Sequence, residues 1–89
     1  MSGGLYGGGD GSSKEKAVII NTTTSLVGIH AEYSWIENKF GTKHKDWKIM
    51  GRLHGTEDNG KSYETFHIEL KDGSQVSIVF GISSFYCKF

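Results

Sequence analysis

The chain has 89 residues, which is enough for one domain. Ten Lys and Arg side chains balance ten Asp and Glu side chains, so the formal net charge is zero. This balance argues against a nucleic-acid coat protein or a polybasic membrane anchor, because both depend on a net positive field. The single cysteine excludes an internal disulfide framework and a cysteine-based zinc site.

The first sixteen residues, MSGGLYGGGDGSSKEK, are rich in glycine and serine. They offer little apolar surface to offset the entropy lost on ordering, which predicts a flexible tail over residues 1–16. The segment lacks the basic and apolar regions of a secretory signal, and the longest apolar run, at 17–20, is too short to span a bilayer. Together with the lone cysteine, this indicates a cytoplasmic protein without a membrane partner.

A single α+β domain is expected over residues 17–89, and it begins with a short apolar strand at 17–20. The sequence leaves the place of this strand open between an edge of the sheet and pairing with another chain. A helix is predicted over 25–40, where apolar residues recur at steps of three and four and Gly41 follows as a C-terminal cap. The predicted sheet-facing stripe of this helix is Leu26, Ile29, Tyr33, Ile36 and Phe40.

Three strands are predicted after the helix, joined by two tight turns. Asn59-Gly60 is typical of a two-residue hairpin turn, which places Leu53 opposite Phe66. At the second turn, a three-residue loop with Gly73 in the left-handed conformation keeps the apolar side chains on one face and places Phe66 opposite Ile78. The predicted fold is therefore a two-layer α+β domain of order β-α-β-β-β, with one helix packed on an antiparallel meander and a disordered glycine-rich N-terminal tail.

A basic segment runs from the end of the predicted helix into the next strand. Phe40 and Trp47 are interleaved with its cationic side chains, a combination suited to phosphate contact and base stacking. The segment is therefore a candidate site for an anionic ligand or nucleic acid, although cations near a helix C-terminus are also favoured for purely structural reasons. The candidate binding residues are Lys39, Lys43, Lys45, Lys48 and Arg52.

The predicted register also gathers His54, His67 and Glu69 on the open face of the sheet, near Arg52 and Ser77. One hypothesis is a small enzyme in which His67 acts with Glu69 or with His54. The alternative is the water-exposed face of an antiparallel sheet, which is polar for that reason alone. A closed metal site needs more ligands than this cluster offers, so neither a metal nor a cofactor is predicted.

Aromatic side chains provide the candidate interface residues, which are Trp35 on the helix and Phe85, Tyr86 and Phe89 in the C-terminal segment. Trp35 lies off the predicted stripe, where it is also suited to covering the edge of the core. The C-terminal segment is expected either to dock on the domain or to pair two subunits. In the absence of a catalytic motif, the sequence favours a small non-enzymatic interaction module. A protein partner or a second copy would bind through an edge strand or through this segment.

Overall fold

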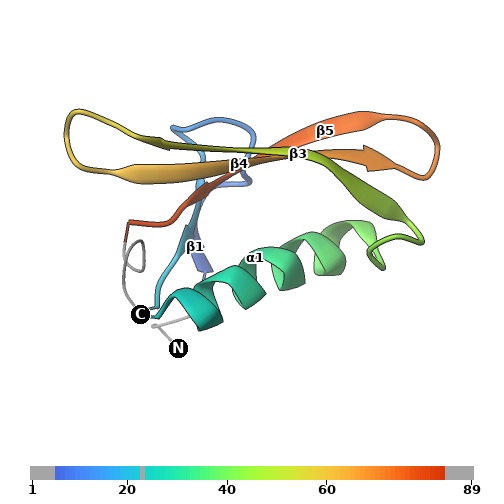
Figure 1. Cartoon of the computed structure of the whole chain (residues 1–89), viewed down its shortest axis with the longest axis horizontal. Helices are drawn as coiled ribbons and strands as arrows, with labels where there is room; N and C mark the ends of the chain where they lie inside the picture. Colours follow the sequence, from blue (N-terminus) through green and yellow to red (C-terminus); the bar gives the residue numbers. More distant parts are fainter. Residues whose placement is uncertain (1–5, 23, 84–89) are drawn as a thin grey trace.

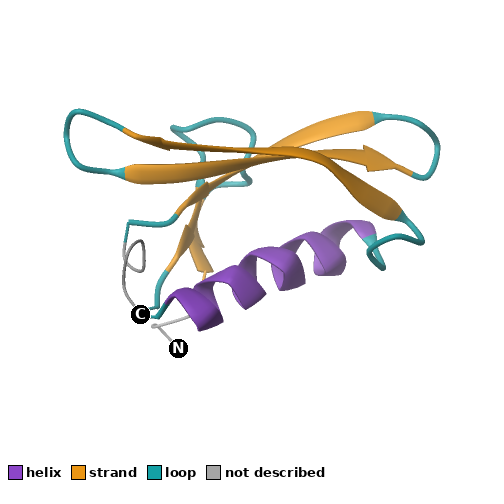
Figure 2. Ribbon diagram, viewed as in Figure 1, coloured by secondary structure: helices purple, strands orange, loops and turns teal. Residues whose placement is uncertain are grey.

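The computed structural model of the chain describes residues 6–22 and 24–83. One helix packs against one face of a five-stranded sheet (Figures 1 and 2). In chain order the elements are β1 (Tyr6–Gly8), β2 (Val18–Ile20), α1 (Ser25–Phe40), β3 (Trp47–Thr56), β4 (Ser62–Leu70) and β5 (Gln75–Gly81). The predicted α+β class and the β-α-β-β-β order are confirmed, with β1 as an additional strand before them.

The sheet has the strand order β1-β2-β5-β4-β3. Its last three strands along the chain form the predicted antiparallel meander. The strand expected at 17–20 is β2, which lies inside the sheet, antiparallel to β1 and parallel to β5. The sheet is therefore mixed, and its edges in the described chain are β1 and β3 rather than β2.

Within the segment predicted as a flexible tail, Tyr6–Gly8 forms β1 and pairs with β2 at one edge of the sheet. The Gly11 carbonyl accepts a hydrogen bond from the Val79 amide at 2.8 Å, so the chain leading into β2 lies beside β5. The Tyr6 hydroxyl donates to the Ala31 carbonyl of α1 at 2.7 Å. Gly11 has a φ of 81°, and a Cβ there would approach a β5 side chain at 2.8 Å. Glycine at this position therefore permits close packing against β5, and residues 1–5 of the predicted tail lie outside the described residues.

Helix α1 has the predicted bounds because both of its ends are capped. The Thr24 hydroxyl accepts a hydrogen bond from the Val27 amide at 3.4 Å. At the other end the Gly41 amide donates to the Glu37 carbonyl at 2.9 Å, and Gly41 has a φ of 108°. A Cβ at this position would collide with the carboxylate of Asp46, so the cap needs glycine for two reasons.

The side of α1 that faces the sheet is rotated away from the predicted stripe. Ile36 is buried as expected, but Leu26 is 82% exposed and Ile29 is 43% exposed. The other buried side chains of the helix are Ala31 and Glu32. The helix thus turns a carboxyl group toward the sheet, and a pattern based on apolar spacing counts that position as surface.

The second turn has the predicted geometry, whereas the first turn differs by one residue. Gly73 has a φ of 90° and Phe66 pairs with Ile78, as expected for the three-residue loop. At the first turn Gly60 also adopts a positive φ, of 85°, which makes this a three-residue loop too. Leu53 therefore lies opposite Thr65 instead of Phe66.

A β-bulge in β3 changes which side chains of this strand face α1. The register shifts between Ile49 and Gly51, so Met50 is the extra residue. Before the bulge, Ile49 lies on the helix side of the sheet with Ile68 as its partner. After the bulge, Arg52 lies on that side, although the unbroken alternation of the predicted strand placed it on the open face.

The core lies between α1 and the part of the sheet that the helix covers. Among residues 6–22 and 24–83, three aromatic pairs pack edge to face within it: Phe66 with Phe80, Trp35 with Phe80, and Tyr33 with Phe66. The buried core residues are Val18, Ile20, Ala31, Ile36, Trp47, Phe66, Ile68, Ile78, Phe80 and Ile82.

Candidate functional site

The five predicted anion-binding residues do not form one patch. Lys48 lies on the face of the sheet away from α1 and pairs with Glu69, with 3.2 Å between the charged atoms. Arg52 lies on the opposite face because of the bulge, and it pairs with Glu64 at 2.7 Å. The prediction that Arg52 lies on the same side of this strand as the other cationic residues is therefore wrong, because Lys48 and Arg52 lie on opposite faces of the sheet.

Lys39 and Lys43 lie over aromatic rings at the C-terminal end of α1. The Lys39 ammonium is 5.2 Å from the centre of the Trp35 ring, and the Lys43 ammonium is 4.6 Å from the centre of the Tyr33 ring. Such contacts contribute about 0.5–1 kcal/mol at exposed sites. They give both lysines a structural role that needs no ligand.

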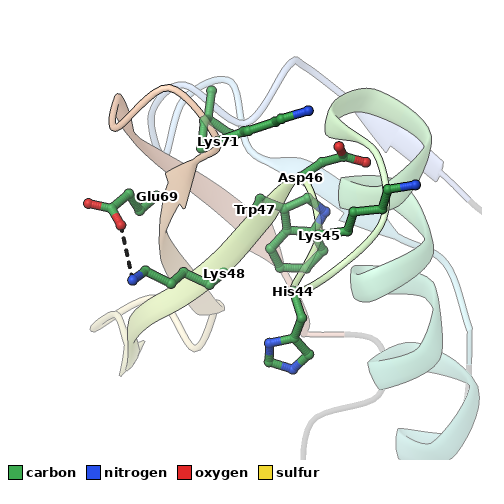
Figure 3. A pocket seen from close by; sticks show the side chains of 8 residues that line it. His44, Lys45, Asp46, Trp47, Lys48, Glu69 and Lys71 are labelled. Atoms are coloured by element: carbon green, nitrogen blue, oxygen red, sulfur yellow. Dashed lines mark ion pairs between the residues drawn. The ribbon is translucent and has the colours of Figure 1, made fainter.

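A hollow of about 240 Å³ lies where the loop between α1 and β3 meets the turn between β4 and β5 (Figure 3). Lys45 and Lys71 extend to the same side of Trp47, and Lys48 extends to the other side. The Lys71 amide donates to the Asp46 carbonyl at 2.9 Å, which joins the loop to the turn. Lys71 was not singled out from the sequence, because it reaches this loop only through the pairing of β3 with β4.

The carboxylates around this hollow are all engaged in local interactions. Asp46 accepts a hydrogen bond from the Thr42 amide at 2.8 Å, and Asp72 accepts one from the Ser74 amide at 2.9 Å. The third carboxylate, Glu69, is the ion-pair partner of the β3 lysine described above. The Asp46 carboxylate lies on the same side of the loop as two of the lysines and lowers the positive potential there (Figure 3).

Lys45 and Lys71 form no ion pair with another residue of the described chain. Each places a compact, strongly hydrated ammonium group on a flexible stem beside the hollow. His44 lines the same hollow. This end of the molecule therefore offers two unpaired cations from different segments of the chain.

Of the two aromatic residues that suggested base stacking, Trp47 is buried and Phe40 is partly buried. Trp47 is 2% exposed, and its indole N–H donates to the Gly41 carbonyl at 2.7 Å. Phe40 packs against the core. Stacking on a base needs an exposed ring face, so the geometry favours contacts with the charge of an anion over contacts with nucleobases.

The predicted polar patch is divided between the two faces of the sheet. On the face away from α1, the Nδ1 atom of His67 lies 2.8 Å from the Ser77 hydroxyl, and Glu69 is paired with Lys48. His54 lies on the helix side, after the bulge. His54 and His67 therefore share neither a substrate nor a metal, and residues 6–22 and 24–83 contain no group of three His, Cys, Asp or Glu side chains placed to hold a metal ion.

A second polar cluster, which the sequence did not single out, lies between α1 and the β3–β4 hairpin. The Arg52 guanidinium donates to the Glu64 carboxylate at 2.7 and 3.3 Å and lies 5.0 Å from the centre of the Phe66 ring. One of its nitrogens is 3.5 Å from the Tyr33 hydroxyl. Glu32 completes the cluster; it is fully buried, and no described residue donates a hydrogen bond to either of its carboxyl oxygens.

Burial raises the pKa of Glu32 to about 9, and the nearby Glu64 carboxylate acts in the same direction while Arg52 opposes it. Glu32 is therefore protonated at neutral pH. Two ionised carboxylates can only accept hydrogen bonds, so a proton on Glu32 supplies the donor that the pair otherwise lacks. Glu32 lies four residues, about one helical turn, from both Gly28 and Ile36, so the three residues share one side of the helix. This spacing is the sequence signal from which the burial of Glu32 could have been predicted.

The predicted interface residues have different outcomes. The Trp35 ring packs edge to face on Phe80, with 5.7 Å between centroids, so it covers the edge of the core. Phe85, Tyr86 and Phe89 lie outside the described residues. Exposed aliphatic side chains occur instead on the N-terminal half of α1, at Leu26, Val27 and Ile29.

No protein-family model, curated protein or solved structure matches this chain. Within the described residues, no helix combines the length and the apolar character that crossing a bilayer requires.

Proposed function

We propose that this protein is a small non-enzymatic binding module that recognises phosphate-bearing ligands through its cationic end, formed by Lys45, Lys48 and Lys71. One observation carries the proposal: Lys45 and Lys71 lie beside a hollow of about 240 Å³ and have no ion-pair partner in the described chain. An ammonium group is a point charge that suits a phosphate oxygen. The nearby carboxylates are held by turn amides or by Lys48, so none of them pairs with these two lysines.

The expected binding is weak and sensitive to salt. The lysines beside the hollow are exposed to solvent, where salt screens charges over about 10 Å at moderate ionic strength. Since Trp47 is buried and Phe40 packs partly against the core, a nucleic acid would be bound mainly through its phosphates, with little dependence on base sequence.

The proposal is tested by an NMR titration of the protein with inorganic phosphate and, separately, with a short single-stranded oligonucleotide. We expect changes in NMR chemical shift that are confined to residues 44–48 and 69–72, and the apparent affinity should fall as salt is added. Reversing both charges, Lys45→Glu with Lys71→Glu, should weaken binding by about tenfold or more, since each exposed charge pair contributes up to about 1 kcal/mol.

A matched control reverses two exposed lysines away from the cationic end, Lys16→Glu with Lys61→Glu. This variant has the same net charge as the first and should bind with an affinity close to that of the unmodified protein. Equal losses in the two variants would mean that net charge alone governs binding, and the absence of any shift change would contradict the proposal outright.

Self-association is a second candidate function, favoured by the exposure of Leu26, Val27 and Ile29 on one half of α1. Sedimentation velocity over a range of concentrations tests it. A mass that rises with concentration and returns to that of the monomer in Leu26→Ser with Ile29→Ser would support it. A monomer at all concentrations would remove it.

A further inference from the structure

The contact between α1 and the β3–β4 hairpin contains a buried acid without a hydrogen-bond donor. Glu32 is fully buried on the sheet side of the helix, and neither of its oxygens receives a hydrogen bond from the described residues. A buried ionised carboxylate without a donor is among the most costly arrangements in a protein interior. The stable form of this contact therefore requires either a proton on Glu32 or a cation beside it.

The cation nearest to this site is already committed to another acid. Arg52 donates two hydrogen bonds to Glu64, and its remaining contacts are with the Tyr33 hydroxyl and the Phe66 ring. One positive charge thus faces two carboxyl groups. A single proton on Glu32 balances the cluster and lets Glu32 donate a hydrogen bond to the Glu64 carboxylate.

We propose that Glu32 and Glu64 form a proton-sharing carboxyl pair, a proton latch, which holds α1 against the hairpin while Glu32 is protonated and releases the helix when Glu32 ionises. The charged groups that act on Glu32 are Glu64 from β4 and Arg52 from β3, and Arg52 also contacts the Tyr33 hydroxyl of the helix. Burial and the Glu64 charge raise the pKa of Glu32 to about 9, which places the release on the alkaline side of neutrality.

Release of α1 requires less than complete unfolding, because the N-terminal half of the helix is weakly held. Leu26 and Ile29 are exposed, and the next large side chain that α1 buries is Glu32 itself. Segments with few buried apolar contacts open at a lower free energy than the strands of the core. The latch therefore acts on the helix while β4 and β5 remain paired.

Amide hydrogen exchange from about pH 6 to about pH 9 tests the latch, because the opened helix releases one proton from Glu32. The protection factors of α1 amides should fall about tenfold per pH unit and should lie below those of β4 and β5. In Glu32→Gln, which mimics the protonated acid, this pH dependence should vanish. Glu37→Gln makes the same change at an exposed position of the same helix and should retain it.

The titration of Glu32 itself, followed by carboxyl-carbon NMR in the unmodified protein, is independent of any variant. A midpoint near 9 supports the latch, and Glu64→Gln should lower it because Arg52 then becomes available to Glu32. A midpoint near the ordinary value of 4.5, a pH dependence that persists in Glu32→Gln, or equal protection of α1 and β5 would each overturn the proposal.

Discussion

Replacing Glu32 by glutamine should stabilise the protein at neutral pH. In the unfolded chain Glu32 has the ordinary pKa of 4.5, whereas burial raises the pKa to about 9 in the folded protein. The folded state therefore holds one proton more than the unfolded state between these values, and the free energy of unfolding falls as the pH rises through this range. Glutamine is neutral at every pH and has the shape of the protonated acid, so it removes this loss.

The magnitude follows from the distance between the assay pH and the ordinary pKa. At pH 7 the difference is about 2.5 units, and at about 1.4 kcal/mol per unit the stabilisation by Glu32→Gln is about 3 kcal/mol. This is a large share of the roughly 5–15 kcal/mol by which folded domains are stable. The gain should be smaller at pH 5 and should disappear at about pH 4, where both chains are neutral at this position.

Urea unfolding of the two proteins at a series of pH values measures the effect, with Glu37→Gln as the control at an exposed position. The midpoint for Glu32→Gln should stay nearly constant relative to the control, while that of the unmodified protein falls from pH 5 to pH 8. A Glu32→Gln variant that is no more stable than the unmodified protein at pH 7, or whose advantage does not grow with pH, would refute the reasoning.

Three further substitutions test separate parts of the fold. Trp47→Phe should cost about 1–3 kcal/mol in denaturant unfolding, because the Gly41 carbonyl loses the indole donor at 2.7 Å; an unchanged midpoint would assign that hydrogen bond no net contribution. Gly11→Ala should lower the melting temperature by several degrees, because φ at this position is 81° and the new Cβ would lie 2.8 Å from Ile78, which together cause strain of about 1–3 kcal/mol. A melting temperature equal to that of the unmodified protein would contradict the packing of residues 6–16. Deleting Met50 removes the bulge from the edge strand β3 and should preserve the fold. Self-association, measured by sedimentation, should increase, because a regular edge strand pairs with another chain more readily than a bulged one. Loss of folding would show instead that the bulge sets the register between β3 and β4.

The elements predicted well from the sequence are those whose signals are local. Helix α1 begins and ends where Thr24 and Gly41 provide caps, and the second turn follows from the left-handed preference of Gly73. Each of these signals lies within a few residues of the structure that it specifies. The class and the order of elements follow from such signals without knowledge of the distant contacts.

The incorrect predictions for β3 have a common origin, because one extra residue in a turn or a bulge reverses which face of the sheet the following side chains occupy. Asn59-Gly60 fits a two-residue and a three-residue loop equally well, and the bulge at Met50 has no local signature beyond the glycine that follows it. Both errors shift side chains between the faces of the sheet. They account for the misplacement of Arg52 and His54, and hence for the predicted patch that the structure divides.

The two sites differ in how far they could be predicted. The basic character of the cationic end was visible because Lys45 and Lys48 are neighbours in sequence, but Lys71 joins them only when β4 pairs with β3. The carboxyl pair is not predicted from the sequence, because Glu32 lies outside the apolar stripe that predicts the sheet-facing side of the helix. The burial of Glu32 depends on how α1 is rotated about its axis. The apolar residues Leu26 and Ile29 predict a different rotation, in which they face the sheet, but both are exposed.

The place of β2 in the sheet has a consequence for how the chain folds. The β2–β5 contact joins Val18 to Phe80, so it closes a loop that includes the helix and the whole β3–β4 hairpin. The pairings within the meander are short-range and should form early, whereas closure of this long loop should be late and should limit the folding rate. During synthesis the sheet therefore cannot be completed until β5 has emerged, and until then the apolar strand β2 can pair only with β1 and lacks its second neighbour.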